Sequence, residues 1–208
     1  SAAQDWDLVI VPLSAFKRVG VDPATRAQHI TTKLSDLEDQ LNGDLETDDS
    51  IKRLEAAKAK LEEKLEEAMD EAANKADLGL TFEASGCDYL FIDEAHNFKN
   101  LARECGIEEL ALSGSDQATD LSMKLAYLRE MRRSEAAKRG VGEGAYVERV
   151  ATFATGTPVS NSMAEEWVWQ TYLRPDLLAD AGVERLEAWG QNFTTTVTRV
   201  ELNSSRTR

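Results

Sequence analysis

The sequence predicts an α/β fold, in which a buried parallel sheet is flanked by helices. Three short apolar runs indicate strands, at residues 6–11, 88–92 and 149–155. The long stretches between them repeat apolar residues at helical spacing, which is typical of parallel strands joined through helices. Because functional side chains of such sheets gather at the carboxyl ends of the strands, the polar residues after each run are the first candidates for a site.

An antiparallel helical hairpin over residues 23–77 is predicted between the first two strands. Its apolar residues alternate steps of three and four, as they do on one face of a helix. These residues are Ile30, Leu34, Leu37 and Leu41 in the first helix, and Ile51, Leu54, Leu61, Leu65, Ala68 and Ala72 in the second, where Lys58 interrupts the stripe. The turn Asn42-Gly43-Asp44 separates the helices, and residues 47–50 offer caps for the second helix.

The hairpin also holds most of the negative charge of the chain, whose formal net charge is −14. Residues 35–77 contain 15 acidic and 6 basic side chains, whereas the other 165 residues carry a net charge of only −5. A charge this negative argues against a protein that coats nucleic acid. Two interpretations of the hairpin stay open: a surface connection between core elements, or a protruding arm that binds a protein partner.

The second strand is followed by Asp93-Glu94-Ala95-His96. At the end of a buried strand, the first carboxylate can hold Mg²⁺ through water, and the second can orient or deprotonate a water that attacks a phosphate. The plain alternative is a charged turn in which Asp93 caps the next helix. A zinc protease site is not favoured, because His96 has no second histidine four residues away.

The third strand leads into the turn Thr155-Gly156-Thr157-Pro158. This turn presents hydroxyl groups and a free backbone amide to a neighbouring carboxylate or phosphate. Ser162 and Glu165 then have the spacing of a helix capping box. Trp167 and Trp169 follow on the predicted helix, where aromatic residues usually belong to the core, although an exposed aromatic pair stays open.

Together these residues resemble the first RecA-like motor domain of superfamily 2 helicases and translocases, and most closely its Swi/Snf-type branch. Residues 91–100 (Phe-Ile-Asp-Glu-Ala-His-Asn-Phe-Lys-Asn) match the DEAH-x-x-Lys-Asn form of motif II, and residues 154–161 (Ala-Thr-Gly-Thr-Pro-Val-Ser-Asn) match the TGTP-x-x-N form of motif III. Residues 6–18 are similar to the strand before motif II, and residues 172–193 to large helicase–DNA methylase proteins of phages and mobile elements.

The resemblance implies that residues 1–208 form a partial RecA-like helicase domain 1, of the P-loop NTPase type, with the hairpin inserted. It implies an ATP-dependent motor with ATP and Mg²⁺ as cofactors. Asp93 would bind Mg²⁺ through water, and Glu94 would be the catalytic base for the attacking water. Both carboxylates would face the nucleotide, and His96 would link the nucleotide site to motif III.

The same resemblance implies that Thr155, Gly156 and Thr157 couple hydrolysis to movement on DNA. Lys99 and Asn100 match the family pattern without an assigned role. The plain alternative for Lys99 is an exposed charge early in a helix.

The phosphate-cradling loop of the family is missing from these residues. No G-x-x-x-x-G-K-[ST] occurs, and the glycine run at 140–144 lacks the lysine and precedes a strand. The resemblance implies that the loop lies upstream of residue 6, and that an arginine finger lies in a second RecA-like domain downstream. We therefore expect an excised fragment that partners this second domain in a longer protein and hydrolyses no ATP alone, since an arginine finger contributes about 10³–10⁵-fold.

Double-stranded DNA is the expected partner of the motor. Arg129, Arg132 and Arg133 are the candidate contacts, in a basic stretch that ends in Lys138 and Arg139. Basic side chains near the end of a helix also favour its dipole, so this interpretation and phosphate contact both stay open.

Two function classes remain. The first is an ATP-driven helicase or translocase motor in the cytoplasm of a bacterial or phage-infected cell, with a DNA methylase fused elsewhere in the parent as an added expectation. The second is a catalytically inactive helicase-fold module that binds a protein through the acidic hairpin. The intact Asp93 and Glu94 favour the first class, since nothing structural demands both carboxylates. No run of 18 apolar residues occurs, so no membrane-spanning helix is expected.

Overall fold

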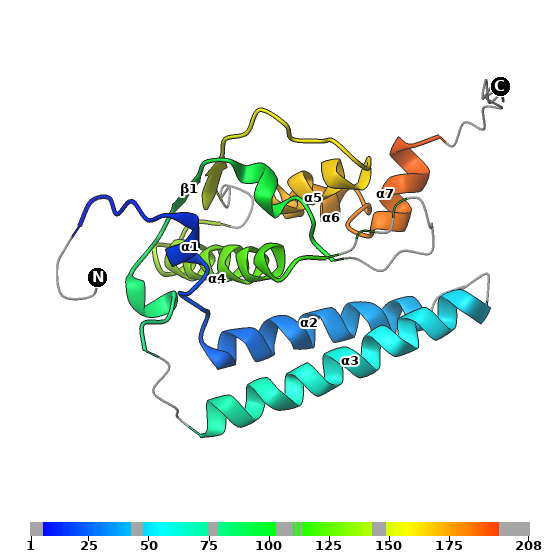
Figure 1. The fold of residues 1–208 in the computed structure, drawn as a ribbon, viewed down its shortest axis with the longest axis horizontal. Coiled ribbons are helices and arrows are strands. Elements are labelled where there is room, and N and C mark those ends of the chain that lie inside the picture. Colours follow the sequence, from blue (N-terminus) through cyan, green and yellow to red (C-terminus); the bar gives the residue numbers. More distant parts are fainter. Residues whose placement is uncertain are drawn as a thin grey trace, which may run out of the picture.

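The computed structural model describes residues 6–42, 48–74, 79–102, 110, 112, 114–142 and 149–195. These residues form a mixed α/β structure that is mostly helical (Figure 1). A two-stranded sheet and helices α4 to α7 make up one part, and the long helices α2 and α3 lie beside it. Helix α4 contacts α2 on one side and the segment after β1 on the other.

The sheet pairs β1 (Leu90–Ile92) with β2 (Ala151–Phe153) in parallel. Phe91 lies opposite Thr152 in the register. The predicted run at 88–92 is therefore a strand over its last three residues, and the run at 149–155 is a strand at its centre. Residues on one face of the sheet pack against the core, whereas Phe91 on the other face is 75% exposed.

The predicted first strand is wrong: residues 6–11 form no strand among the described part of the chain. Their apolar side chains stand in solvent, with Ile10 at 87% exposure. A strand is stable only where a neighbouring strand takes up its backbone hydrogen bonds and its apolar face. No described strand pairs with residues 6–11, so their β-type composition alone does not make them a strand.

Helix α4 (Asp116–Lys138) runs through the centre of the structure. Ser115 caps it, because its Oγ accepts a hydrogen bond from the backbone N–H of Ala118 at 3.2 Å. The helix buries Leu121, Leu125 and Leu128 completely, which gives the core its central stripe. Gly140 then takes a left-handed conformation, with φ of 71°, just beyond the end of the helix.

Three shorter helices follow β2: α5 (Ala164–Leu173), α6 (Pro175–Asp180) and α7 (Leu186–Phe193). Trp167 and Trp169 on α5 are both buried, so the core interpretation of these residues is right and the exposed alternative is wrong. Trp169 packs edge-on against Phe153 of β2, with ring centroids 5.5 Å apart. This contact attaches α5 to the inner face of the sheet.

Shorter elements complete the core. Helix α1 (Leu13–Phe16) precedes the hairpin, and two 3₁₀ turns, η1 (Glu83–Ser85) and η2 (Ala95–Phe98), flank β1. Phe16 meets both Phe82 and Phe98 edge-on, which joins these three segments. No helix of the described residues is long and apolar enough to cross a bilayer.

The hairpin consists of α2 (Pro23–Leu41) and α3 (Asp48–Ala73). Its helices lie side by side and run in opposite directions, as two ion pairs show: Arg26 with Glu71 at 2.9 Å, and Glu38 with Lys58 at 2.8 Å. The lysine that interrupts the apolar stripe thus binds the opposite helix. The predicted turn residues Gly43 and Asp44, and the end of the predicted hairpin at 75–77, lie outside the described residues.

Candidate active site

The carboxyl ends of β1 and β2 bring the two sequence motifs together. Backbone pairing continues past both strands, since the N–H of Ala154 donates to the carbonyl of Ile92 at 2.8 Å, and the N–H of Ala95 donates to the carbonyl of Ala154 at 3.0 Å. Residues 93–96 therefore lie beside residues 154–157, as expected for adjacent parallel strands.

Asp93 and Glu94 form a tight turn with both side chains exposed to solvent. The Asp93 carboxylate accepts a hydrogen bond from the N–H of Glu94 at 2.9 Å. Glu94 has a φ of 49°, in the left-handed region that residues other than glycine rarely adopt. The Asn97 side chain fixes the turn by donating to the Glu94 carbonyl at 2.8 Å. Glu94 occupies the cap position of η2 without a side-chain cap bond, so this turn does not use Asp93 as a helix cap.

His96 lies between the two motifs. Its Nδ1 is 3.2 Å from Oε2 of Glu94 and 3.3 Å from Oγ1 of Thr155. One imidazole nitrogen is thus within hydrogen-bonding distance of the carboxylate on the β1 side and the hydroxyl on the β2 side. The three side chains make a continuous contact across the end of the sheet.

The Thr155–Pro158 turn is closed by its own first residue. Oγ1 of Thr155 accepts a hydrogen bond from the backbone N–H of Thr157 at 3.2 Å. The Thr157 amide is therefore bonded inside the turn, whereas the side of the turn formed by Gly156 and Thr157 is exposed. The carbonyl of Pro158 accepts a hydrogen bond from the Trp169 indole at 2.6 Å, which attaches the turn to α5.

A second contact between the motifs, which sequence reasoning missed, joins Lys99 to Glu165. The Lys99 ammonium lies 3.2 Å from the Glu165 carboxylate, and it also donates a hydrogen bond to the Ser160 hydroxyl. The Lys99 side chain is 11% exposed and that of Glu165 is 1% exposed. The alternative of an exposed charge at position 99 is therefore wrong.

Glu165 does not complete the predicted capping box with Ser162. Its Oε2 instead accepts hydrogen bonds from the backbone N–H groups of Ser160 at 2.7 Å and Asn161 at 3.5 Å. Ser162 uses its hydroxyl to accept from the N–H of Ala164 at 3.2 Å. The spacing of the two residues predicted the start of a helix correctly, but the Glu165 carboxylate bonds the backbone before Ser162, where it also contacts Lys99.

Other side chains hold the segment after β1 in place. The Tyr172 hydroxyl lies 3.0 Å from the carbonyl of Phe98 and 3.2 Å from that of Ala118, so it connects α5, η2 and α4. Gln117 donates to the carbonyl of Asn97 at 3.2 Å. The residues that follow the two carboxylates are thus anchored to both neighbouring helices.

The three arginines predicted to contact DNA have different surroundings. Arg129 donates to the carbonyl of Tyr172, and Arg132 donates to the carbonyl of Asp88 at 3.2 Å. Arg133 is 56% exposed and pairs with Glu130 at 3.1 Å. Arg129 and Arg132 therefore also connect α4 to α5 and to the start of the β1 region, a role that the sequence pattern did not indicate.

The carboxylates at this end of the sheet suit a magnesium ion that is shared with a phosphate. Among the described residues, no group of three or more histidine, cysteine, aspartate or glutamate side chains could hold a metal ion by itself. Mg²⁺ in phosphate-binding sites commonly takes one or two carboxylates, with waters and phosphate oxygens as the other ligands. The exposed Asp93 carboxylate fits that donor set.

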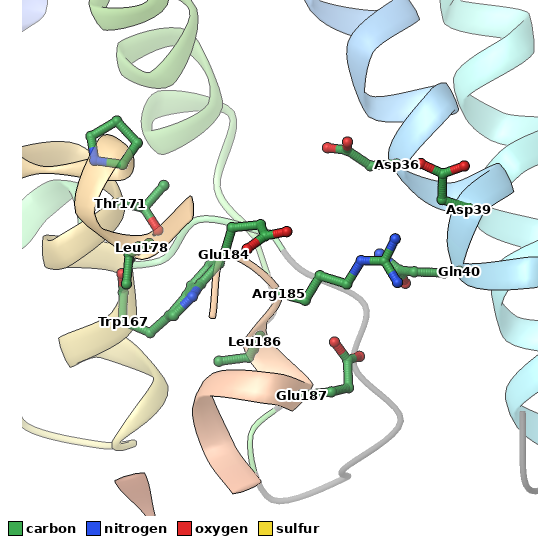
Figure 2. A pocket seen from close by; sticks show the side chains of 11 residues that line it. Asp36, Asp39, Gln40, Trp167, Thr171, Leu178, Glu184, Arg185, Leu186 and Glu187 are labelled. Carbon is green, nitrogen blue, oxygen red and sulfur yellow. Dashed lines mark hydrogen bonds between the residues drawn. The ribbon is translucent and has the colours of Figure 1, made fainter. Parts of the chain in front are cut away.

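A separate cavity of about 290 Å³ opens between α2 and the helices α5 to α7. Figure 2 shows Arg185 extending from the start of α7 toward Gln40 of α2. The cavity is lined by Asp36, Asp39, Gln40, Trp167, Thr171, Pro175, Leu178, Glu184, Arg185, Leu186 and Glu187. None of the predicted site residues lines it, so we place the candidate active site at the open end of the sheet.

Comparison with known proteins gives one finding. A family model described as a probable helicase domain matches residues 2–207. No curated protein matches the chain. No solved structure matches it either.

Proposed function

We propose, because the chain belongs to the probable helicase domain family, that it is part of an ATP-driven motor that acts on double-stranded DNA. The finer assignment to a Swi/Snf-type, DEAH-box member of superfamily 2 rests on the motif resemblance at residues 91–100 and 154–161. The observation that carries the proposal is the contact of Glu94, His96 and Thr155 across two adjacent strand ends.

In this proposal Glu94 accepts the proton of the water that attacks the terminal phosphate. Its carboxylate is exposed, so it can meet a water molecule, and its other contact is the Nδ1 of His96. A positioned general base contributes about 10²–10⁴-fold to a rate. Since His96 also contacts Thr155, a change in the position or protonation of Glu94 reaches the Thr-Gly-Thr-Pro turn directly.

Asp93 would hold Mg²⁺ through water, and the ion would neutralise charge on the phosphates of ATP. The hydrogen bond from the N–H of Glu94 fixes one Asp93 oxygen at the end of β1. In this proposal the two carboxylates have separate tasks, with Asp93 holding the metal and Glu94 acting on the water.

DNA-stimulated ATP hydrolysis by a longer protein that contains these residues tests the proposal. We expect Glu94→Gln to lower kcat by about 10²–10⁴-fold, because glutamine cannot accept the proton. Glu135→Gln makes the same chemical change at an exposed position on α4 and should leave kcat unaltered. A protein that is folded and binds nucleotide but shows no turnover would contradict the motor, and would favour the protein-binding role of the acidic hairpin.

The 208 residues contain no G-x-x-x-x-G-K-[ST] sequence. We therefore propose that a phosphate-binding segment outside them completes the nucleotide site, and that a second RecA-like domain supplies an arginine finger. On this basis the isolated chain should hydrolyse no ATP. Mg²⁺-dependent turnover by the pure 208-residue chain that Glu94→Gln abolishes would show that the missing segments are not required.

A further inference from the structure

We propose that Lys99 is a positioning residue that couples the Asp-Glu turn to the Thr-Gly-Thr-Pro turn, an inference that rests on the proposed motor function. The two turns already meet through His96 and Thr155. Lys99 provides a further side-chain connection at the end of η2, because it binds both Ser160 and Glu165. Together with the backbone hydrogen bond from Ala95 to Ala154, these side-chain contacts restrain the relative orientation of the two segments at the start and at the end of η2.

The burial of the pair argues for a geometric role. Ion pairs with little exposure add little net stability, because removing both charges from water costs about as much as their attraction returns. The Lys99–Glu165 pair does favour one relative position of the two turns. If one turn shifted, the Glu165 carboxylate, which is only 1% exposed, would lose its cation. The pair therefore penalises any independent movement of the two turns.

Glu165 transmits this constraint into the backbone. Its carboxylate binds the N–H groups of Ser160 and Asn161 at the end of the Thr-Gly-Thr-Pro segment. Its own helix, α5, is attached to the sheet through Trp169 and to η2 through Tyr172. A displacement of η2 during hydrolysis would thus reach residues 155–161 together with α5.

Amide hydrogen exchange on the 208-residue chain provides the first test. In Lys99→Met we expect amides in residues 155–161 to exchange at least tenfold faster, because Ser160 and Glu165 lose the side chain that holds them. Lys138→Met removes the same charge at the exposed end of α4 and should leave these amides unaltered. Lys99→Arg keeps the charge and should restore most of the protection. Unaltered exchange in Lys99→Met would overturn the inference.

The second test measures ATP hydrolysis by the longer helicase with and without DNA. We expect Lys99→Met to lower the ratio of the DNA-stimulated rate to the basal rate by about tenfold, and Lys99→Arg to recover part of it. Equal losses in both rates would indicate a merely structural residue and overturn the inference while the motor function stands. A wild-type helicase without DNA-stimulated hydrolysis would overturn the motor function, and this role of Lys99 with it.

Discussion

At the scale of single residues, Lys124 is the charged side chain with the least exposure among the described residues, at 0%. Its ammonium donates to the carbonyl of Phe16 at 3.0 Å and to Asp120 at 2.6 Å, and it lies 3.9 Å from the centre of the Phe16 ring. A buried ammonium needs such partners, because an unpaired charge inside a protein is very costly. Lys124 therefore attaches α1 to the central helix with polar bonds inside an apolar core.

Asp120 gives this cluster a pH dependence. Burial raises the pKa of Asp120 above its ordinary value of 3.8, and the Lys124 ammonium offsets only part of that rise. A carboxyl whose pKa is higher in the folded state adds stability below its unfolded pKa, and this contribution disappears as the pH rises through the folded pKa. Compared with Asp120→Asn, the wild-type chain should therefore lose unfolding free energy as the pH rises from below the ordinary pKa of 3.8 through the raised pKa of the folded state.

Urea unfolding of both proteins at several pH values measures this difference. A wild-type advantage that grows with pH would contradict the prediction, since it would mean that the ion pair outweighs burial and lowers the pKa.

At the scale of elements, the hairpin has an apolar interior of its own. Ile30, Leu37, Leu54 and Ala68 are buried but lie outside the main core cluster. They belong to α2 and α3, which pack against each other and are joined by the ion pairs Arg26–Glu71 and Glu38–Lys58. The hairpin should therefore be able to loosen without unfolding the rest of the molecule.

Leu54→Ala should reveal this independence. The loss of a buried leucine from the interface costs about 2–4 kcal/mol in a well-packed site, so amides of α3 should exchange faster. Amides of α4 and the two strands should keep their protection, because Leu54 does not belong to their core. Hydrogen exchange with mass spectrometry measures both regions at once.

Met69→Ala is the matched control on α3, since Met69 is 58% exposed and its truncation should leave exchange unaltered. Equal loss of protection in the hairpin and in α4 after Leu54→Ala would contradict the prediction and indicate one cooperative unit.

The elements also show how far the sequence could predict this fold. The strands at 90–92 and 151–153 and the long helices were predictable, because local apolar patterns determine them. The run at 6–11 was not, since an extended segment becomes a strand only through a distant partner. That the two motifs lie side by side was predictable, because both follow parallel strands of one sheet. The Lys99–Glu165 pair was not predictable, because it joins residues 66 positions apart and no local sequence pattern indicates such a contact.

At the scale of the whole molecule, the negative net charge of the chain opposes binding to DNA, its proposed substrate. The formal net charge is −14, and the acidic hairpin contributes most of it. Binding to DNA without sequence preference depends on neutralising phosphates with basic side chains. We expect the isolated chain to bind a DNA duplex more weakly than about 10⁻⁴ M at 150 mM salt, a typical weak limit of non-specific binding.

Fluorescence anisotropy with a labelled duplex at 50 and 200 mM salt measures this affinity. Micromolar binding with a steep salt dependence would contradict the prediction, and would show that the basic stretch around Arg133 outweighs the net charge. Arg133→Glu and Lys64→Glu make the same change of charge on α4 and on the hairpin, so a loss confined to the first would locate the contact.

At position 94, the residue that would favour folding stability differs from the residue that the proposed reaction needs, because the backbone of Glu94 is left-handed. A residue with a Cβ in that conformation costs roughly 1–2 kcal/mol that glycine avoids. A search for more thermostable variants would therefore favour glycine at position 94 and discard the carboxylate that we propose as the base. Selection by thermostability alone would then retain variants without catalytic activity, because glycine at position 94 would be among the stabilising substitutions.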